Sequence, residues 1–265
     1  MESKKSKIYK NPTVKIVIFQ IRYSNLFMIE NKIGDYQTKI IEKFPESSFT
    51  VKREMIFADV GPEFKMEEIK PKETIGGRKI WKFRSNNRYE LNVLTNSLDI
   101  SSKKHKSYYG NGESEGFRDI IKFAVDNFLD LIPIKTIKRI GLRYVDDSPI
   151  PPLDTTTFKE WYNTALPLNR FKIDEVGSMN FEVRNVKSNG YEFNYKEQFF
   201  PEKAEGSSDF KNRYTLDFDG YATNISAESY LEVLDKLHDL IHNEWENNTI
   251  KQPVKDWMEK DKEET

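Results

Sequence analysis

Apolar and polar residues alternate along much of the chain, and this pattern predicts strands, because successive side chains of a strand point to opposite faces. The first such segment is TVKIVIFQIRY, residues 13–23. In residues 79–103, turn residues at 85–87 and 96–97 divide the alternation into three antiparallel strands. Four further segments are predicted as strands: 49–60, 138–147, the hairpin 179–200 with its Asn189-Gly190 turn signal, and 213–224.

Other segments carry apolar residues at spacings of three and four, which is the period of an amphipathic helix. One predicted helix occupies residues 26–44 and ends before Pro45. A second occupies 115–130, and a short third occupies 155–166 with Asp154 or Thr155 as its cap. The last occupies 226–247, with one apolar face made of Tyr230, Val233, Leu234, Leu237, Ile241 and Trp245.

Both halves of the chain have the order strand, helix, several antiparallel strands, helix. Their leading strands also share a phrase, QIRY at 20–23 and GLRY at 141–144. The pattern predicts an α+β fold: a largely antiparallel sheet with helices packed on one face. Two ferredoxin-like repeats, 13–133 and 134–248, are an open alternative within a domain that spans 13–248. Residues 1–12 are predicted to be a basic N-terminal arm and 249–265 a charged C-terminal tail.

Composition narrows the class of protein. The 265 residues include 42 Lys and Arg and 43 Asp and Glu, so the net charge of −1 argues against a strongly basic nucleic-acid binder and leaves a local basic patch open. There is no cysteine, which excludes disulfides and thiolate metal sites and fits a reducing compartment. No apolar run approaches the roughly 18 residues of a membrane span, and no signal peptide is visible. We therefore expect a cytoplasmic protein without a membrane partner.

The segment KRIGLRYVDD, residues 138–147, places two arginines on a strand. Ile140, Leu142 and Tyr144 share one face, and Arg139, Gly141 and Arg143 share the other. One interpretation is an ion-pair ladder with Asp217 and Asp219 of RYTLDFDGY, which Arg22 joins in the first half. The alternative is an anion-binding groove, where Gly141 lets a ligand approach the backbone. The neighbouring carboxylates Asp146 and Asp147 point to opposite faces and do not act as a catalytic pair.

Two histidines, His238 and His242, lie four residues apart on one side of the last helix. Such a pair can coordinate a metal ion, with Asp217 or Asp219 as a third ligand from the sheet. The zincin motif needs a glutamate directly after the first histidine, and Asp239 stands there instead. The alternative is that both histidines pack at the core boundary and hydrogen-bond locally. We expect no cofactor.

The segment KKHKSYYGNGESEGF, residues 103–117, interleaves basic and aromatic residues. Lys103, Lys104 and Lys106 are candidates for phosphate contacts, and the tyrosines for base stacking. The glycine spacing matches neither standard phosphate-loop fingerprint. The alternative is a solvated hairpin that caps a helix. Nucleophilic catalysis has little support, since the chain has no cysteine and no Gly-x-Ser-x-Gly elbow.

Taken together, several segments resemble a known family. They are NPTVKIVIFQIRY, KIWKFRSNNRYELNV, RIGLRYVDD, YTLDFDGY and LDKLHDLIHNEWE, and they extend from Asn11 to about Glu246. The pattern is similar to that of a sporadically distributed, largely uncharacterised prokaryotic protein family. Members usually carry an acidic residue in the first strand, where this chain has Lys15. The resemblance implies a shared fold without an established catalytic activity. The patchy distribution is typical of genes on defence islands and mobile elements.

These observations give three hypotheses about function. The first is a non-enzymatic binding or interaction module with a protein partner, an accessory or regulatory component of an antiviral-defence or toxin-type system. The second is a sensor of an anion, nucleotide or nucleic acid that uses Arg22, Arg139, Arg143, Lys103, Lys104 and Lys106. The third is a metal-dependent phosphodiesterase that uses Asp217, Asp219, His238 and His242. The oligomeric state is left open.

Overall fold

The alternating segments of the chain form one antiparallel sheet. The computed structural model describes residues 8–52, 78–86, 88–111, 114–152, 154–203 and 210–260. Within them the sheet has nine strands, in the order β2 (Glu46–Lys52), β3 (Arg78–Ser85), β4 (Tyr89–Val93), β5 (Ser97–Ser102), β1 (Val14–Arg22), β6 (Thr136–Ser148), β9 (Phe210–Ser226), β8 (Tyr191–Lys203) and β7 (Met179–Ser188). The hairpin turn between β7 and β8 has positive φ at Asn189 and Gly190, as its sequence predicts.

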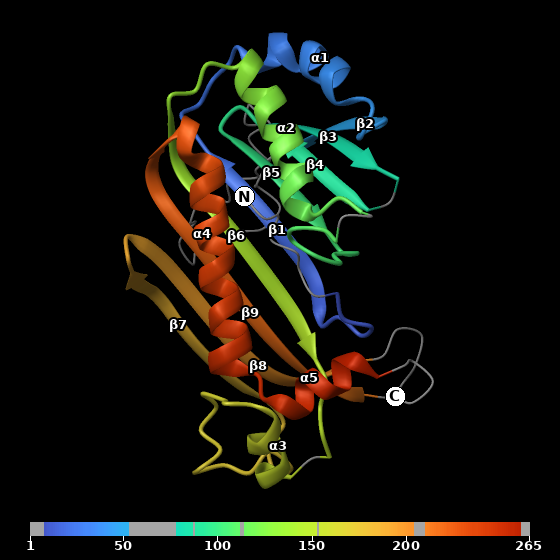
Figure 1. The fold of residues 1–265 in the computed structure, drawn as a ribbon, viewed down its shortest axis with the longest axis vertical. Helices are drawn as coiled ribbons and strands as arrows, with labels where there is room; N and C mark the ends of the chain where they lie inside the picture. Colours follow the sequence, from blue (N-terminus) through green and yellow to red (C-terminus); the bar gives the residue numbers. More distant parts are fainter. Residues whose placement is uncertain are drawn as a thin grey trace, which may run out of the picture.

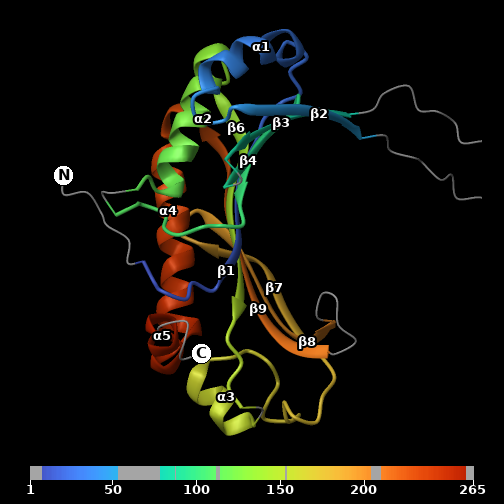
Figure 2. The same ribbon diagram turned by 90° about the vertical axis from the view of Figure 1, so that its right-hand side faces the viewer.

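The main helices cover one face of this sheet (Figures 1 and 2). Among the described residues no helix covers the other face, which we call the open face. Three helices lie on the covered face: α1 (Ile29–Ile40), α2 (Phe117–Leu131) and α4 (Tyr230–Asn243). The shorter α3 (Thr155–Trp161) and α5 (Gln252–Glu259) pack together at one end. The predicted α+β class, with helices on one face of an antiparallel sheet, is confirmed. No helix among the described residues is long and apolar enough to cross a membrane.

The two halves of the chain have matching topologies that meet at β1 and β6. Each of these leading strands pairs with the last strand of its own meander, β1 with β5 and β6 with β9. β1 and β6 also pair with each other, so that Gln20 lies opposite Gly141 and Arg22 opposite Arg139. The phrases QIRY and GLRY therefore start opposite each other, at Gln20 and Gly141, and run in opposite directions along the central pair of strands. This arrangement suits two repeats, and their common origin stays a prediction.

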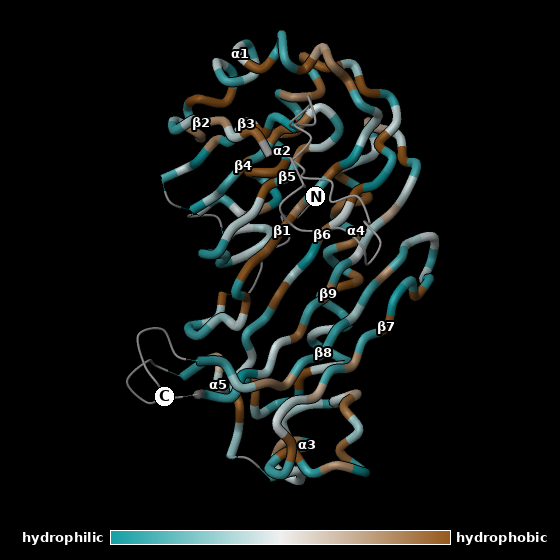
Figure 3. The backbone as a smooth tube through the Cα atoms, turned by 180° about the vertical axis from the view of Figure 1, so that it is seen from behind, coloured by the Kyte–Doolittle hydropathy of each residue, from teal (hydrophilic) through white to brown (hydrophobic). Residues whose placement is uncertain are grey.

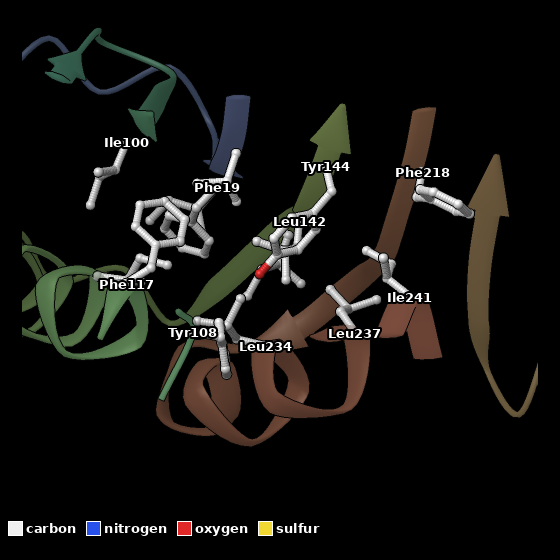
Figure 4. Packing of buried hydrophobic residues seen from close by; sticks show 14 of the residues in the cluster. Phe19, Ile100, Tyr108, Phe117, Leu142, Tyr144, Phe218, Leu234, Leu237 and Ile241 are labelled. Carbon is white, nitrogen blue, oxygen red and sulfur yellow. The ribbon is translucent and has the colours of Figure 1, made fainter. Parts of the chain in front are cut away.

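The core lies between the sheet and the helices. Val17, Phe19, Leu142, Leu216 and Phe218 project from the strands and are fully buried. Ile121, Leu234 and Leu237 meet them from α2 and α4, and Figure 4 shows part of this cluster. Burial of each large apolar side chain contributes about 1.5–3 kcal/mol to folding. The same alternation that builds this core sends the polar residues of β6 and β9 to the open face.

The two ends of the chain differ from the prediction of an arm and a tail. Residues 252–259 form α5, in which Val254 and Met258 are buried. The backbone N–H of Asn11 donates to the carbonyl of Met258 at 2.9 Å, and Asn11 Nδ2 donates to the carbonyl of Lys260 at 2.8 Å. Val254 and Met258, four residues apart, dock this short helix, and the partly buried Trp257 also packs against the core. Residues 1–7 and 261–265 lie outside the described residues.

Other element boundaries shift by a few residues. The predicted strand 49–60 appears as β2, and its part from residue 53 onward lies outside the described residues. Asp154 caps α3, as predicted, by accepting hydrogen bonds from the N–H groups of Thr156 at 2.9 Å and Thr157 at 3.0 Å. The predicted last helix, 226–247, divides into a 3₁₀ turn, Ala227–Ser229, then α4 and a π-helical segment, Glu244–Thr249.

Candidate ligand-binding site

The arginine face of β6 meets the carboxylates of β9 on the open face of the sheet. Arg143 donates to both oxygens of Asp217, from Nε at 2.8 Å and from Nη2 at 2.5 Å. Arg139 Nη2 donates to both oxygens of Asp219, at 3.1 and 3.0 Å. Arg143 stands opposite Asp219 and reaches Asp217 diagonally, whereas Arg139 stands opposite Thr223 and reaches four residues along β9 to Asp219. The predicted ion pairs of Arg139 and Arg143 with these aspartates are present, and each contributes roughly 0.2–1 kcal/mol. Arg22, predicted to join them, donates to Gln20 instead.

Gly141 makes room for Arg139 rather than for an external ligand. A Cβ atom at Gly141 would lie 2.6 Å from Nη1 of Arg139. The same guanidinium lies over the ring of Tyr221, 4.5 Å from its centroid. Figure 3 shows this open side of the sheet. Carboxylates of the same chain contact both guanidiniums, so Arg139 and Arg143 do not face an empty groove. Anion binding by these arginines stays a prediction.

The predicted metal site is also wrong, because the sheet separates its residues. Asp217 and Asp219 project to the open face, whereas His238 and His242 lie on α4, which packs on the covered face. His242 Nε2 lies 3.0 Å from Glu246 Oε2, and the ring of His238 stacks on that of Tyr108. The described residues contain no group of three or more His, Cys, Asp or Glu placed to hold a metal ion.

The predicted anion-binding residues are divided between the two faces. Arg22 lies on the open face, where its Nε donates to Gln20 Oε1 at 2.6 Å. Lys106 lies on the covered face, at the edge of a cavity beside α4. Lys103 and Lys104 are exposed at the end of β5. The six cations therefore do not converge on one site, because the sheet separates the arginines from Lys106. A role of these residues in anion binding stays a prediction.

The cavity beside α4 is the candidate ligand-binding site, and we call it the aromatic pocket. Its volume is about 490 Å³, which lies within the range of small-molecule sites. Six segments form its walls: residues 9–14, residues 105–109, β6, Phe218 of β9, α4 with the π-helical segment after it, and Met258 of α5. The rings in its walls belong to Tyr9, His105, Tyr108, Tyr109, Tyr144, Phe218, His238, His242 and Trp245.

A column of stacked rings forms one wall of the aromatic pocket. The rings of Tyr108 and His238 are 3.8 Å apart at their centroids and nearly parallel, at 10°. His242 follows at 5.7 Å from His238, and Trp245 follows at 5.8 Å from His242. The spacing 238, 242, 245 places these residues on one side of the helix. The alternative interpretation of the histidines, packing at the core boundary, describes this arrangement.

Asp146 is the polar group that sequence reasoning missed. It lies on the apolar face of β6 with Leu142 and Tyr144, and its side chain is 2% exposed. Thr13 Oγ1 donates to its Oδ1 at 2.6 Å. Burial raises the pKa of Asp146 to about 7, and the charges of Asp217 and Asp147 act in the same direction. Its carboxyl group is therefore poised between the neutral and the ionised form near neutral pH. The signal in the sequence was a carboxylate on the apolar face of a strand.

The segment 105–109 is held firmly in place against α4. Burial and the nearby charge of Arg88 lower the pKa of His105 to about 4, so this ring is neutral at physiological pH. The hydroxyl of Tyr108 donates to Asp235 Oδ1 at 2.8 Å. Arg118 of α2 donates to both oxygens of the same carboxylate, at 2.7 and 2.9 Å. These bonds tie the pocket wall to two helices from different halves of the chain.

A second hollow, of about 430 Å³, lies on the open face. Arg22, Arg78 and Lys82 line it, together with Asn92 and Asp99. Asn92 Nδ2 donates to Asp99 Oδ2 at 2.9 Å, while the buried Oδ1 of Asn92 has no hydrogen-bond partner within the part of the chain that the structure describes. Burial raises the pKa of Asp99. We call this hollow the basic groove.

Comparison with known proteins finds no matching family model and no matching curated protein. The class of protein is therefore defined by its own fold and geometry. It is an α+β protein with a continuous antiparallel sheet, helices on one face and an aromatic pocket where the two halves meet. The family resemblance of its sequence segments stays a prediction.

Proposed function

We propose that the protein is a non-enzymatic binding module that recognises its ligand in the aromatic pocket. The observation that carries this proposal is the composition of the pocket wall: many rings around one buried carboxyl group, Asp146. Predominantly apolar and aromatic walls with a few placed polar groups are the usual make-up of a small-molecule site. In this proposal Asp146 fixes the orientation of the ligand, and the rings provide the contact area.

The wider role that we propose is that of an accessory or regulatory component of a prokaryotic antiviral-defence or toxin-type system, acting in the cytoplasm. The resemblance of the segments around RIGLRYVDD to a sporadically distributed family supports this role, and the absence of cysteine fits the compartment. In this role, a protein partner would distinguish the protein with ligand in its pocket from the protein without ligand. The pocket suits such coupling, because its walls come from both halves of the chain and from both described ends.

The test is a library of small metabolites and fragments, with tryptophan fluorescence as the readout. Trp245 lines the pocket, whereas the other tryptophans, Trp81, Trp161 and Trp257, do not. We expect a ligand that changes the fluorescence of the wild type and leaves that of a Trp245→Phe variant unchanged. Arg143→Ala is the matched control, since Arg143 lies on the open face and its loss should not affect the response. If no compound of the library produced a saturable change in the fluorescence of Trp245, the proposal would be overturned.

A second candidate function is an anion or nucleotide sensor that uses the basic groove. The observation that favours it is the convergence of Arg22, Arg78 and Lys82 around one hollow. Phosphate contacts of this kind weaken as salt rises. Titration with labelled nucleotides and short oligonucleotides at two salt concentrations tests it. Loss of binding in an Arg22→Ala and Lys82→Ala double variant would support the sensor. An affinity that does not change with salt concentration would count against it.

A further inference from the structure

The charges around the aromatic pocket are predominantly negative. Among the described residues that line it, Asp146, Asp239 and Glu246 are acidic, and Lys106 is the single lysine or arginine. His105 adds no positive charge at neutral pH, because burial and Arg88 lower its pKa to about 4. Glu246 already contacts His242 at 3.0 Å and Lys255 at 3.6 Å. A cation entering the pocket would therefore meet a favourable potential, and an anion an unfavourable one.

The rings of the pocket favour the same charge. The faces of tyrosine and tryptophan rings carry negative electrostatic potential and attract cations. Tyr144 is buried two residues before Asp146 on the same face of β6, and Trp245 lines the pocket from the π-helical segment. A flat group can also stack on such rings, as an ammonium cannot. The walls thus suit a ligand that is planar and positively charged.

In its ionised form, Asp146 can accept more hydrogen bonds than the described part of the chain donates to it. An ionised carboxylate can accept about four hydrogen bonds. Within the described part of the chain, Asp146 receives one side-chain hydrogen bond, from Thr13 Oγ1 at 2.6 Å. A ligand with paired N–H donors would supply the others, in the bidentate geometry that planar nitrogen cations form with carboxylates.

We infer that the aromatic pocket binds a planar nitrogen cation that carries N–H donors, such as an amidinium, a guanidinium or a protonated nitrogen heterocycle, with Asp146 as its counter-ion. This inference rests on the proposed function, because it names the ligand class of the same pocket. Recognition would combine a bidentate contact to the Asp146 carboxylate with stacking on the rings of Tyr144 and Trp245.

Binding of such a cation should depend on pH, because the cation favours the ionised form of Asp146. The pKa of about 7 means that few of the free molecules are ionised at pH 6 and most at pH 8. The affinity should therefore rise by about tenfold over this interval. A neutral ligand that accepts a hydrogen bond from protonated Asp146 would show the opposite trend. Asp147 and Asp217, on the open face, act on Asp146 through their charges. The other charged or titratable groups near Asp146 or in the pocket wall are Tyr9, His105, Lys106, Tyr108, Tyr109, Tyr144, Tyr162, His238, Asp239, His242 and Glu246.

The experiment compares benzamidine with benzamide, which have nearly the same shape and differ in charge. Binding to the full chain is measured by calorimetry and by Trp245 fluorescence at pH 6 and pH 8. We expect benzamidine to bind at least about tenfold more tightly than benzamide at pH 8, because its hydrogen bonds to Asp146 are charge-assisted. Its affinity should rise with pH, and Asp146→Asn should remove both the preference and most of the pH dependence.

Asp147→Asn is the matched control. Asp147 is the next residue of the same strand, and it points to the open face, where Arg213 Nε donates to it at 3.0 Å. Its replacement should leave the affinity for benzamidine within about twofold, as expected for a residue outside the site. Melting temperatures of both variants show whether each is folded. Where Asp146→Asn fails to fold, the wild-type pH profile and the comparison of the two ligands still decide the question.

The outcomes separate this inference from the function on which it rests. Equal or tighter binding of benzamide, or an affinity for benzamidine that falls as pH rises, would overturn the inference that the ligand is a cation. The proposal that the aromatic pocket binds a ligand would stand. No response to benzamidine, together with a neutral ligand found in the library screen, would do the same. No response to either compound and none in the screen would overturn both the inference and the proposed function.

Discussion

The ring of Tyr108 lies face to face with the ring of His238, with centroids 3.8 Å apart and planes within 10°. One ring belongs to the segment between β5 and α2, and the other to α4 near the end of the chain. The contact thus joins the two halves at the wall of the aromatic pocket. The Tyr108 hydroxyl reinforces it by donating to Asp235, one turn before His238 on the same helix.

Replacement of Tyr108 should separate the two parts of this contact. Tyr108→Phe keeps the ring stack and loses the hydrogen bond to Asp235, which should lower the free energy of unfolding by about 1 kcal/mol. Tyr108→Ala also loses the buried ring and should cost about 3–5 kcal/mol. Urea denaturation measures both. Lys172→Ala, at an exposed ion pair, is the control and should have an effect within about 0.5 kcal/mol. Equal losses for the Phe and Ala variants would contradict the importance of the stack.

A second buried carboxylate, Glu197, should be important for stability. It is 0% exposed and accepts hydrogen bonds from the Ala165 N–H at 2.8 Å, from the Tyr195 hydroxyl at 3.2 Å, and from the hydroxyls of Thr164 and Tyr214. Glu197→Ala leaves these donors unsatisfied in the core and should cost about 3 kcal/mol or more. Glu197→Gln keeps the shape and one acceptor oxygen, so its cost should be smaller. The measurement is denaturant unfolding, and a loss below that of an exposed glutamate would contradict this role.

Gly141 and Arg139 should behave as a coupled pair. In Gly141→Ala, the new Cβ would lie 2.6 Å from the Arg139 guanidinium, which must then leave Asp219 and Tyr221. Because the end of a long side chain can move, we expect a modest cost of about 1 kcal/mol. In an Arg139→Ala background the same substitution should cost almost nothing. A double-mutant cycle by urea denaturation measures the coupling, and additive costs would show that Gly141 is needed for another reason.

The open face of the sheet was largely predictable from the sequence. Alternation along β6 and β9 assigned Arg139, Arg143, Asp217 and Asp219 to one face, and the structure pairs them there. The same rule would have excluded the metal site, since it places these aspartates on the face opposite Phe218, against which α4 packs. The metal-site prediction was wrong because it grouped carboxylates and histidines by chemical type, although they lie on opposite sides of the sheet.

The aromatic pocket was not predictable, because its walls depend on how distant segments pack. Tyr9, Tyr108, Asp146, His238 and Met258 share no local pattern. Asp146 and Glu197 did leave a signal, as both are carboxylates on otherwise apolar strand faces. That signal indicates a buried carboxyl group, but it does not show which residues surround the group. The docking of α5 is of the same kind, since the contact between Asn11 and Met258 joins the two described ends of the chain.

The pH dependence of stability tests the burial of Asp146 and His105. Burial raises the pKa of Asp146 from 3.8 to about 7, so between these values the folded chain holds a proton that the unfolded chain has lost. The stabilisation from this group is complete below pH 4 and is lost as pH rises through 7. The pKa of His105 falls from 6.5 to about 4, because of burial and the charge of Arg88. Its stabilisation is complete above pH 6.5 and is lost as pH falls through 4.

These two effects oppose each other in the wild type, and single variants should expose each one. Asp146→Asn cannot ionise, so its stability relative to the wild type should increase from pH 4 to pH 8 by on the order of 4 kcal/mol. His105→Gln should change in the opposite direction, gaining relative to the wild type as pH falls from 6.5 to 4. Urea denaturation at half-unit steps of pH measures both differences, in which the titration of all other groups cancels. A difference for Asp146→Asn that stays constant with pH would mean that this carboxyl group titrates normally, and the pH-dependent binding inferred for the aromatic pocket would then have no source in Asp146.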